Sequence, residues 1–135
     1  MRIEHVALPW VARTWPVAQP FIEDALAFSH GDFTAEQALV HVADGRWQLF
    51  VAVDEDGAVR GAAVLNVFNR NAQRVAFILA IGGKLISNQD TFVQLKALCA
   101  SFGATHIEGA ARESIARLWT RYGLTEKYRI VGVKL

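Results

Sequence analysis

The chain has 135 residues, of which 53% are hydrophobic and 20% are charged. This composition is typical of a single globular domain with a proper core, and it excludes a disordered chain. The 14 basic residues nearly balance the 13 acidic ones, and they are scattered along the sequence. We therefore expect no nucleic-acid partner, because such a partner needs a clustered basic face.

The single cysteine and the first ten residues bear on location. Cys99 is the only cysteine, so no disulfide can form within the chain, and a reducing compartment is expected. The start, MRIEHVALPW, lacks the long apolar region of a signal peptide, and no apolar run reaches the length of a membrane span. No metal site is indicated by the histidine spacing. These features predict a cytoplasmic protein without a membrane or metal partner.

The first third of the chain predicts one strand and two helices. A short strand is expected at residues 3–8. Pro16 and Pro20 favour a helix start, so the first helix is expected from about Ala18 until Gly31 ends it. Thr34 and Gln37 match a capping box, which predicts a second, short helix through residue 42.

Three strands in a meander follow. They are expected at residues 47–53, 58–68 and 73–81. Asp56-Gly57 is a strong hairpin signal for the first turn, and residues 69–71 supply the second. Because polar residues alternate little with apolar ones, we expect helices to cover both faces of this sheet.

The last third predicts two helices and two strands. SNQD, residues 87–90, begins a helix with one apolar face: Phe92, Leu95, Cys99 and Phe102. A short strand at residues 105–109 follows. The next helix has an apolar stripe that ends before Gly123: Ile115, Leu118, Trp119 and Tyr122. KYRIVGVKL, residues 127–135, is expected to form the final strand.

The element order is therefore β-α-α-β-β-β-α-β-α-β. It predicts a single α/β (α+β) domain over residues 1–135. Its central sheet is mixed and mostly antiparallel, with helices on both faces. One parallel β-α-β step is expected around the third helix.

At this point nearly the whole chain resembles the GNAT superfamily of N-acetyltransferases, as a divergent member. The element order carries this resemblance, together with the segment ARESIARLWTRYGL, residues 111–124. That segment is similar to the closing motif of the family, an amphipathic helix that carries an aromatic residue and ends in Gly-Phe. Gly123-Leu124 stands for Gly-Phe here, and Trp119 stands where the family usually has tyrosine.

The resemblance implies acetyl-coenzyme A as a co-substrate. In this family the coenzyme enters a slot between the fourth and fifth strands, and its pyrophosphate rests on the loop that opens the third helix. Here that loop is residues 82–88. The residues implied to contact the coenzyme are Leu79, Ile81, Gly82, Gly83, Lys84, Ser87, Asn88 and Trp119.

The loop departs from the family pattern. That pattern is Arg or Gln, two residues, Gly, one residue, then Gly or Ala, and its three positions fall here on Gly83, Ile86 and Asn88. Two of the three residue types are lost. We infer from the residues themselves that Gly82-Gly83-Lys84 could form a shifted cradle for phosphate. The alternative is a plain turn.

The catalytic groups are sparse. No ionisable side chain lies between Val75 and Gly83, where the family often has a glutamate. The candidate bases are His106 and Glu108, which alternate to one face of the fifth strand, and Tyr122 is the candidate acid. The plainer alternatives are an ion pair between Glu108 and an arginine such as Arg112, and a core position for the aromatic residues.

Three functions stay open from the sequence. The first is an acyl-coenzyme A-dependent N-acyltransferase acting on a small-molecule or protein amine. The second is a catalytically degenerate GNAT-like binding or assembly protein, similar to small phage-encoded members. Its partner would be a second copy of the chain, virion proteins or a host factor. It would act in the host cytoplasm or the virion. The third is an inhibitor that binds a partner through exposed tryptophans: Trp10, Trp15 and Trp47.

Overall fold

A five-stranded sheet forms the centre of the computed structural model, which describes residues 1–29 and 31–135. The strands follow one another in chain order across the sheet. The first four pair antiparallel, and the last two pair in parallel, as the sequence predicts. Their bounds are β1 (Arg2–Val6), β2 (Gln48–Val53), β3 (Val59–Arg70), β4 (Gln73–Gly83) and β5 (His106–Gly109).

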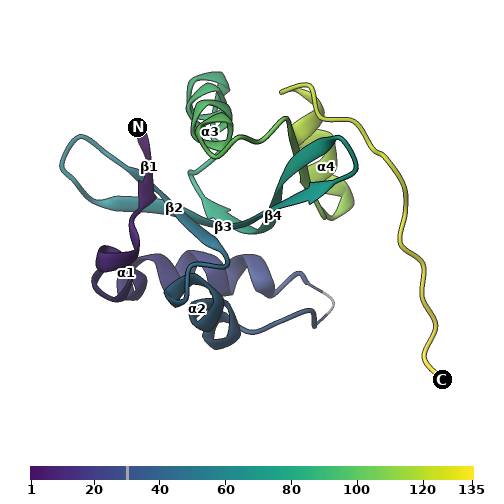
Figure 1. Cartoon of the computed structure of the whole chain (residues 1–135), viewed down its shortest axis with the longest axis horizontal. Coiled ribbons are helices and arrows are strands. Elements are labelled where there is room, and N and C mark those ends of the chain that lie inside the picture. Colours follow the sequence, from purple (N-terminus) through teal and green to yellow (C-terminus); the bar gives the residue numbers. More distant parts are fainter. Residues whose placement is uncertain (30) are drawn as a thin grey trace.

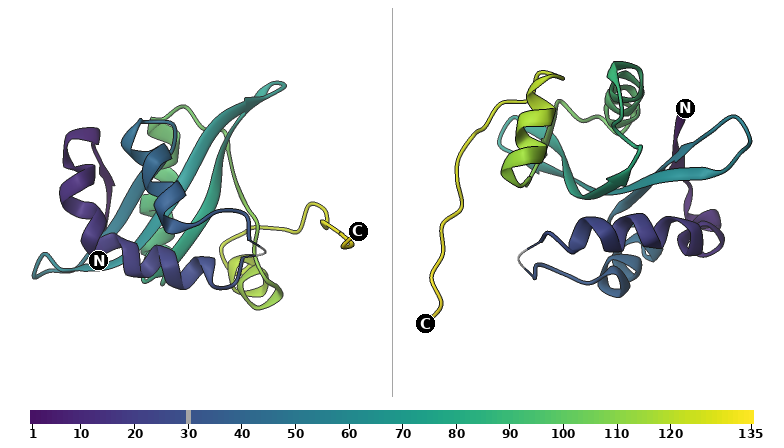
Figure 2. Two further views of the ribbon diagram at one scale, coloured as in Figure 1. Left: turned by 90° about the horizontal axis from the view of Figure 1, so that it is seen from below. Right: turned by 180° about the vertical axis from the view of Figure 1, so that it is seen from behind.

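Helices cover both faces of the sheet (Figures 1 and 2). α1 (Leu8–Leu26) and α2 (Ala35–Ala43) lie on one face, and α3 (Gln89–Ser101) and α4 (Glu113–Thr120) lie on the other. Each face has its own cluster of buried side chains, because successive residues of a strand point to opposite sides. The predicted α/β architecture with helices on both faces is confirmed for the first nine elements.

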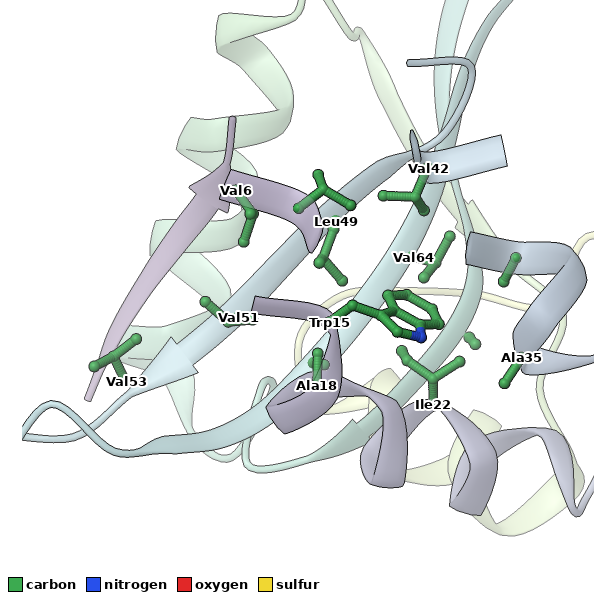
Figure 3. Close-up of a cluster of buried hydrophobic side chains, with 14 residues drawn as sticks. Val6, Trp15, Ala18, Ile22, Ala35, Val42, Leu49, Val51, Val53 and Val64 are labelled. Carbon is green, nitrogen blue, oxygen red and sulfur yellow. The ribbon is translucent and has the colours of Figure 1, made fainter. Parts of the chain in front are cut away.

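The first helix is longer than predicted and begins earlier. It starts at Leu8, with Pro9 in its first turn, and ends at Leu26, whereas the sequence predicted a start near Ala18. Pro16 and Pro20 lie inside it, and each removes one intrahelical hydrogen bond. An apolar stripe that runs the length of the helix offsets this cost; its buried residues are Val11, Trp15, Ala18 and Ile22. Figure 3 shows Trp15, Ala18 and Ile22 in the core on this face of the sheet.

The predicted caps and turns are present. Thr34 and Gln37 form the capping box at the start of α2. Asn88 forms a second box with Thr91 at the start of α3. In the first hairpin, Gly57 has a φ of 82°, which asparagine and glycine adopt most easily. These local signals need only neighbouring residues, which explains why the sequence predicts them well.

The predicted final strand is wrong. Residues 125–135 form no strand and are exposed throughout, and the segment extends away from the sheet (Figure 1). Ile130, Val131 and Val133 are 83–89% exposed. Alternating branched residues give strand propensity, but a strand also needs a hydrogen-bonded neighbour, and β5 pairs only with β4. The rest of the closing motif holds, since the Leu124 amide donates to the Trp119 carbonyl behind Gly123.

Membrane insertion has no support among the helices. Within residues 1–29 and 31–135, no helix is both long enough and apolar enough to cross a bilayer.

Candidate functional site

β4 and β5 form a fork. They pair from Val75 and His106 to Ile78 and Gly109, and β4 then continues to Gly83 paired with β3 but not with β5. A β-bulge lies at the point of separation, because Leu79 has no opposite residue in β3. Such bulges bend a strand locally and often lie beside functional sites. The fork is the place where the resemblance expects the coenzyme.

Gly82 and Gly83 belong to β4 rather than to the loop that the sequence predicted from residue 82. A Cβ atom on Gly82 would overlap the Phe21 carbonyl of α1. Gly83 has a φ of 66°, and a Cβ atom there would overlap the Arg60 carbonyl of β3. The two glycines therefore let β4 pack closely against α1 and β3, and the connection to α3 is residues 84–88.

Most amides of this connection are bonded within the protein. The Lys84 amide donates to the Arg60 carbonyl at 2.9 Å. The Ser87 and Asn88 amides both donate to Thr91 Oγ1, at 3.0 and 3.2 Å. Of residues 84–88, only two have amides without an acceptor in the described part of the chain. The connection does not form the row of free amides that a phosphate cradle needs.

Trp119 packs on the α3/α4 face at the point where β4 and β5 separate. It is 5% exposed. An ideal Cβ atom on Gly109 would lie 3.1 Å from Trp119 Cζ3 and 3.2 Å from Ile78 Cβ. The indole therefore lies against the last paired residues of both strands, and glycine at position 109 makes room for it.

Tyr122 lies apart from the two candidate bases. Its ring packs on Phe92 of α3, with 5.4 Å between the ring centroids, and so belongs to the α3/α4 face. Ile107 packs on that face as well. His106 and Glu108, its neighbours in β5, therefore point to the α1/α2 face. The three predicted catalytic residues do not come together.

Glu108 is 8% exposed and is paired with an arginine. Arg70 Nη1 donates to both carboxylate oxygens, at 3.0 and 2.9 Å. The ion pair that the sequence offered as an alternative is present, but its partner is Arg70; Arg112 instead lies over the Phe28 ring at 3.8 Å. His106 is half-buried, with Nδ1 2.8 Å from Thr105 Oγ1.

A cavity of about 540 Å³ lies on the α1/α2 face beside the fork. We call it the aromatic cavity. Nine residues from distant parts of the chain line it: Asp32, Phe33, Gln37, His41, Trp47, Phe77, Leu79, Ala110 and Ile130. Of these, the sequence indicated Leu79 as a coenzyme contact and Trp47 as a docking residue. Phe77 could have indicated this site. From the sequence it belongs to a strand of core residues, but in the structure its ring is only half-buried.

The rings of the aromatic cavity contact one another. Phe33 meets Trp47 edge to face at 5.1 Å between centroids, and His41 lies against Trp47 at 4.3 Å. Phe77 is 6.5 Å from Phe68, further along the same face. His41 Nδ1 is buried without a hydrogen-bond partner in the described part of the chain. Such a polar atom costs free energy unless a water or ligand satisfies it.

Other reactive groups offer no second site. Cys99 is buried in α3, and this burial raises the pKa of its thiol to about 11, so it stays protonated and unreactive near neutral pH. Among the described residues, no group of three or more histidine, cysteine or carboxylate side chains could hold a metal ion.

The fold is similar to that of several acetyltransferases over its whole length. An aminoglycoside acetyltransferase from an uncultured soil metagenomic sample, solved with sisomicin, matches with a TM-score of 0.69 at 13% identity, covering 99% of this chain and 95% of that one. Ribosomal-protein-alanine N-acetyltransferase from Brucella melitensis biovar Abortus 2308 matches with a TM-score of 0.64 at 9% identity over all of both chains. Glucosamine-6-phosphate N-acetyltransferase from Arabidopsis thaliana matches with a TM-score of 0.63 at 14% identity, over 98% and 97%.

No protein-family model and no curated protein sequence matches the chain. The structural matches establish the GNAT acetyltransferase fold, and they give no support to the phage type that the sequence suggested.

As folded, the fork does not fit acetyl-coenzyme A. A pantetheine arm entering between β4 and β5 would meet Trp119, which lies against Gly109 at the end of their pairing. The pyrophosphate would meet a connection whose Lys84, Ser87 and Asn88 amides are already bonded. Trp119 and the bonded amides therefore lie where the resemblance places the pantetheine arm and the pyrophosphate.

Proposed function

We propose that this chain is a binding protein on a GNAT acetyltransferase fold, which holds a small ligand in the aromatic cavity and has lost coenzyme-dependent transfer. The observation that carries the proposal is the position of Trp119, packed against both strands at the fork. The bonded amides of residues 84–88 support it independently.

The cost of opening the fork can be compared with binding energies. Removing a buried tryptophan side chain from its contacts costs about 3–5 kcal/mol. A coenzyme that had to displace Trp119 would lose about that much, which weakens binding by more than about a hundredfold.

Calorimetric titration with acetyl-coenzyme A tests this proposal, together with an assay for release of free thiol in the presence of amines. We expect neither heat of binding nor thiol release from the native chain. The informative variant is Trp119→Ala, which empties the fork and should gain measurable coenzyme binding if it remains folded. Its control is Trp10→Ala, because Trp10 is 55% exposed on α1. Saturable binding to the native chain would overturn the proposal.

A second candidate is the acyl-coenzyme A-dependent N-acyltransferase, acting on a small-molecule or protein amine. It is favoured by the bulge at Leu79, which opens toward the aromatic cavity. The coenzyme would supply the acyl group. His106 or Glu108 would take the proton of the amine, and both point to the face of the cavity; Tyr122 would need to move to act as the acid. Saturable turnover that is lost in Glu108→Gln or His106→Ala would establish this candidate.

Protein partners remain predictions. Assembly with virion proteins, with a host factor or with a second copy of the chain is one such prediction, and a cytoplasmic location is another. Of the three tryptophans considered for a docking surface, Trp15 is 5% exposed and therefore belongs to the core. Trp47 lines the aromatic cavity, and only Trp10 is largely uncovered.

A further inference from the structure

We infer that the outer face of α1 is a self-association surface, on which a second copy of the chain packs antiparallel with Val17 at the two-fold axis. This inference goes beyond the proposed function, because it concerns neither the aromatic cavity nor the fork. Three features select a second copy as the partner: the exposed apolar side chains of α1, its charges, and their spacing along the helix.

Exposed apolar side chains collect on α1 and α2. Leu8, Trp10 and Val17 of α1 are 52–55% exposed, and Val40 of α2 is 60% exposed. Before residue 125, the other large apolar side chains exposed in the described part of the chain are Met1, Phe28 and Val93. Apolar surface that gathers on one side of a domain indicates contact with another molecule.

Five exposed residues form one stripe along α1. They follow one another at alternating spacings of three and four positions: Trp10, Arg13, Val17, Pro20 and Asp24. This spacing keeps them on a single face of the helix, as in paired helices. The stripe is apolar apart from one cation towards its start and one carboxylate at its end.

The stripe is complementary to itself when two copies run antiparallel. Trp10 and Asp24 are both seven positions from Val17, so pairing about Val17 places Trp10 opposite Asp24 of the second copy. Arg13 already lies over the Trp10 ring, with its guanidinium carbon 5.6 Å from the ring centroid. The guanidinium is therefore held close to the level that faces this carboxylate. The two-fold axis repeats the Arg13–Asp24 contact at the other end.

Neither charge has a partner within the described part of the chain. The ion pairs found there join other side chains. A parallel pair of helices would place Arg13 beside Arg13 and Asp24 beside Asp24, and like charges repel. The charges therefore select the antiparallel arrangement.

An apolar groove of about 500 Å³ runs beside the stripe, between α1 and α2. No charged residue lines it: Leu8, Val11, Ala12, Trp15, Pro16, Leu39 and Ala43. A two-fold axis perpendicular to α1 keeps both α2 helices on the same side of the contact, so the grooves of the two copies lie next to each other. The stripe itself spans only about 21 Å, so we expect a reversible dimer rather than a permanent one.

Sedimentation equilibrium of the full chain, from about 10 μM to about 1 mM, tests the inference. We expect a monomer–dimer equilibrium. Val17→Asp places two carboxylates face to face at the axis, so the dissociation constant should rise at least about tenfold. Its matched control is Val93→Asp, because Val93 is 49% exposed on α3, on the other side of the sheet. A monomer at every concentration, or equal effects of the two variants, would overturn the inference.

A charge exchange tests the antiparallel register. Arg13→Asp and Asp24→Arg, made singly, each place like charges together, and each should raise the dissociation constant at least about tenfold. The double variant exchanges the charges and should restore association. Arg117→Asp on α4 is the control for charge reversal, since Arg117 is exposed on the other side of the sheet. A double variant as weak as either single variant would overturn the proposed register.

These measurements are separate from the test of the proposed function. Coenzyme binding to a chain that dimerises as expected would overturn the lost transfer and leave this surface standing. A chain that binds no coenzyme and stays monomeric would overturn this surface alone.

Discussion

Single residues decide how the end of β4 is used. Gly82 and Gly83 resemble a phosphate cradle in the sequence. In the structure, however, the backbone of α1 and β3 occupies the space that a side chain at either position would need. The same composition serves both purposes, because each requires a close approach to the glycine backbone. Only the neighbours in space distinguish them, and Phe21 is 61 positions away along the chain.

This packing predicts the effect of Gly82→Ala. The added Cβ overlaps the Phe21 carbonyl, so α1 or β4 must shift, and the free energy of unfolding should fall by about 1–3 kcal/mol. Urea unfolding measures the change. Gly132→Ala is the control, because nothing lies within 4 Å of a Cβ atom there. Equal stability of the two variants would show that β4 does not pack on α1 in this way.

The pair of Arg70 and Glu108 makes a second prediction. Arg70→Ala leaves a carboxylate that is 8% exposed without its partner, so we expect a loss of about 1–3 kcal/mol in unfolding free energy, reduced by the partial exposure of Arg70. Arg60→Ala breaks the exposed pair with Asp54 and should change stability little. In the Glu108→Gln background, Arg70→Ala should cost less, and a double-mutant cycle without coupling would contradict the pair.

Among the elements, α3 shows how a predicted ligand residue can have a structural role. Asn88 caps the helix through the Thr91 amide. Asn88→Ala should therefore lower the unfolding free energy by about 1 kcal/mol, whereas Gln89→Ala, at the exposed next position, should not. Thermal and urea unfolding report this directly. Unchanged stability of Asn88→Ala would show that the cap does not stabilise the folded chain.

The buried thiol of α3 makes a pH prediction. Burial raises the pKa of Cys99 from 9.0 to about 11, so between these values the unfolded chain loses the thiol proton before the folded one does. The contribution of this group to stability is therefore present at neutral pH and lost as the pH rises through that interval. Unfolding free energy measured against pH should fall less steeply in Cys99→Ala. A slope identical to that of the native chain would contradict the burial.

The elements also show what the sequence could predict. The hairpin at Asp56-Gly57, the capping box of α2, the helix start at SNQD and the apolar stripes of α3 and α4 depend on neighbours in the chain, and the structure confirms them. The start of α1 is predicted too late because Pro16 and Pro20 are typical of a helix start, whereas packing on the sheet holds both prolines inside the helix. The last strand was wrong because propensity does not supply a hydrogen-bonded neighbour.

At the scale of the whole molecule, the site depends on contacts that no local pattern contains. Arg70 and Glu108 are 38 positions apart, and the β3–β4 hairpin and the β4–α3–β5 crossover bring them together. The aromatic cavity likewise combines the start of α2, the start of β2 and the middle of β4. The sequence therefore predicts the fold well, whereas the contacts that form the aromatic cavity lie beyond its local patterns. A fold shared with acetyltransferases does not by itself assign the reaction.

The closed fork is tested most directly by the indole N–H signal of Trp119 in a ¹⁵N-labelled chain, which has four tryptophans and so four such signals. Trp119→Phe identifies the signal, and acetyl-coenzyme A is then titrated to millimolar concentration. Since the indole is buried against Gly109 at the fork, we predict that its chemical shift does not change. A saturable shift of that signal, accompanied by the Lys84 amide, would show that the coenzyme enters the fork and would contradict the proposed loss of transfer.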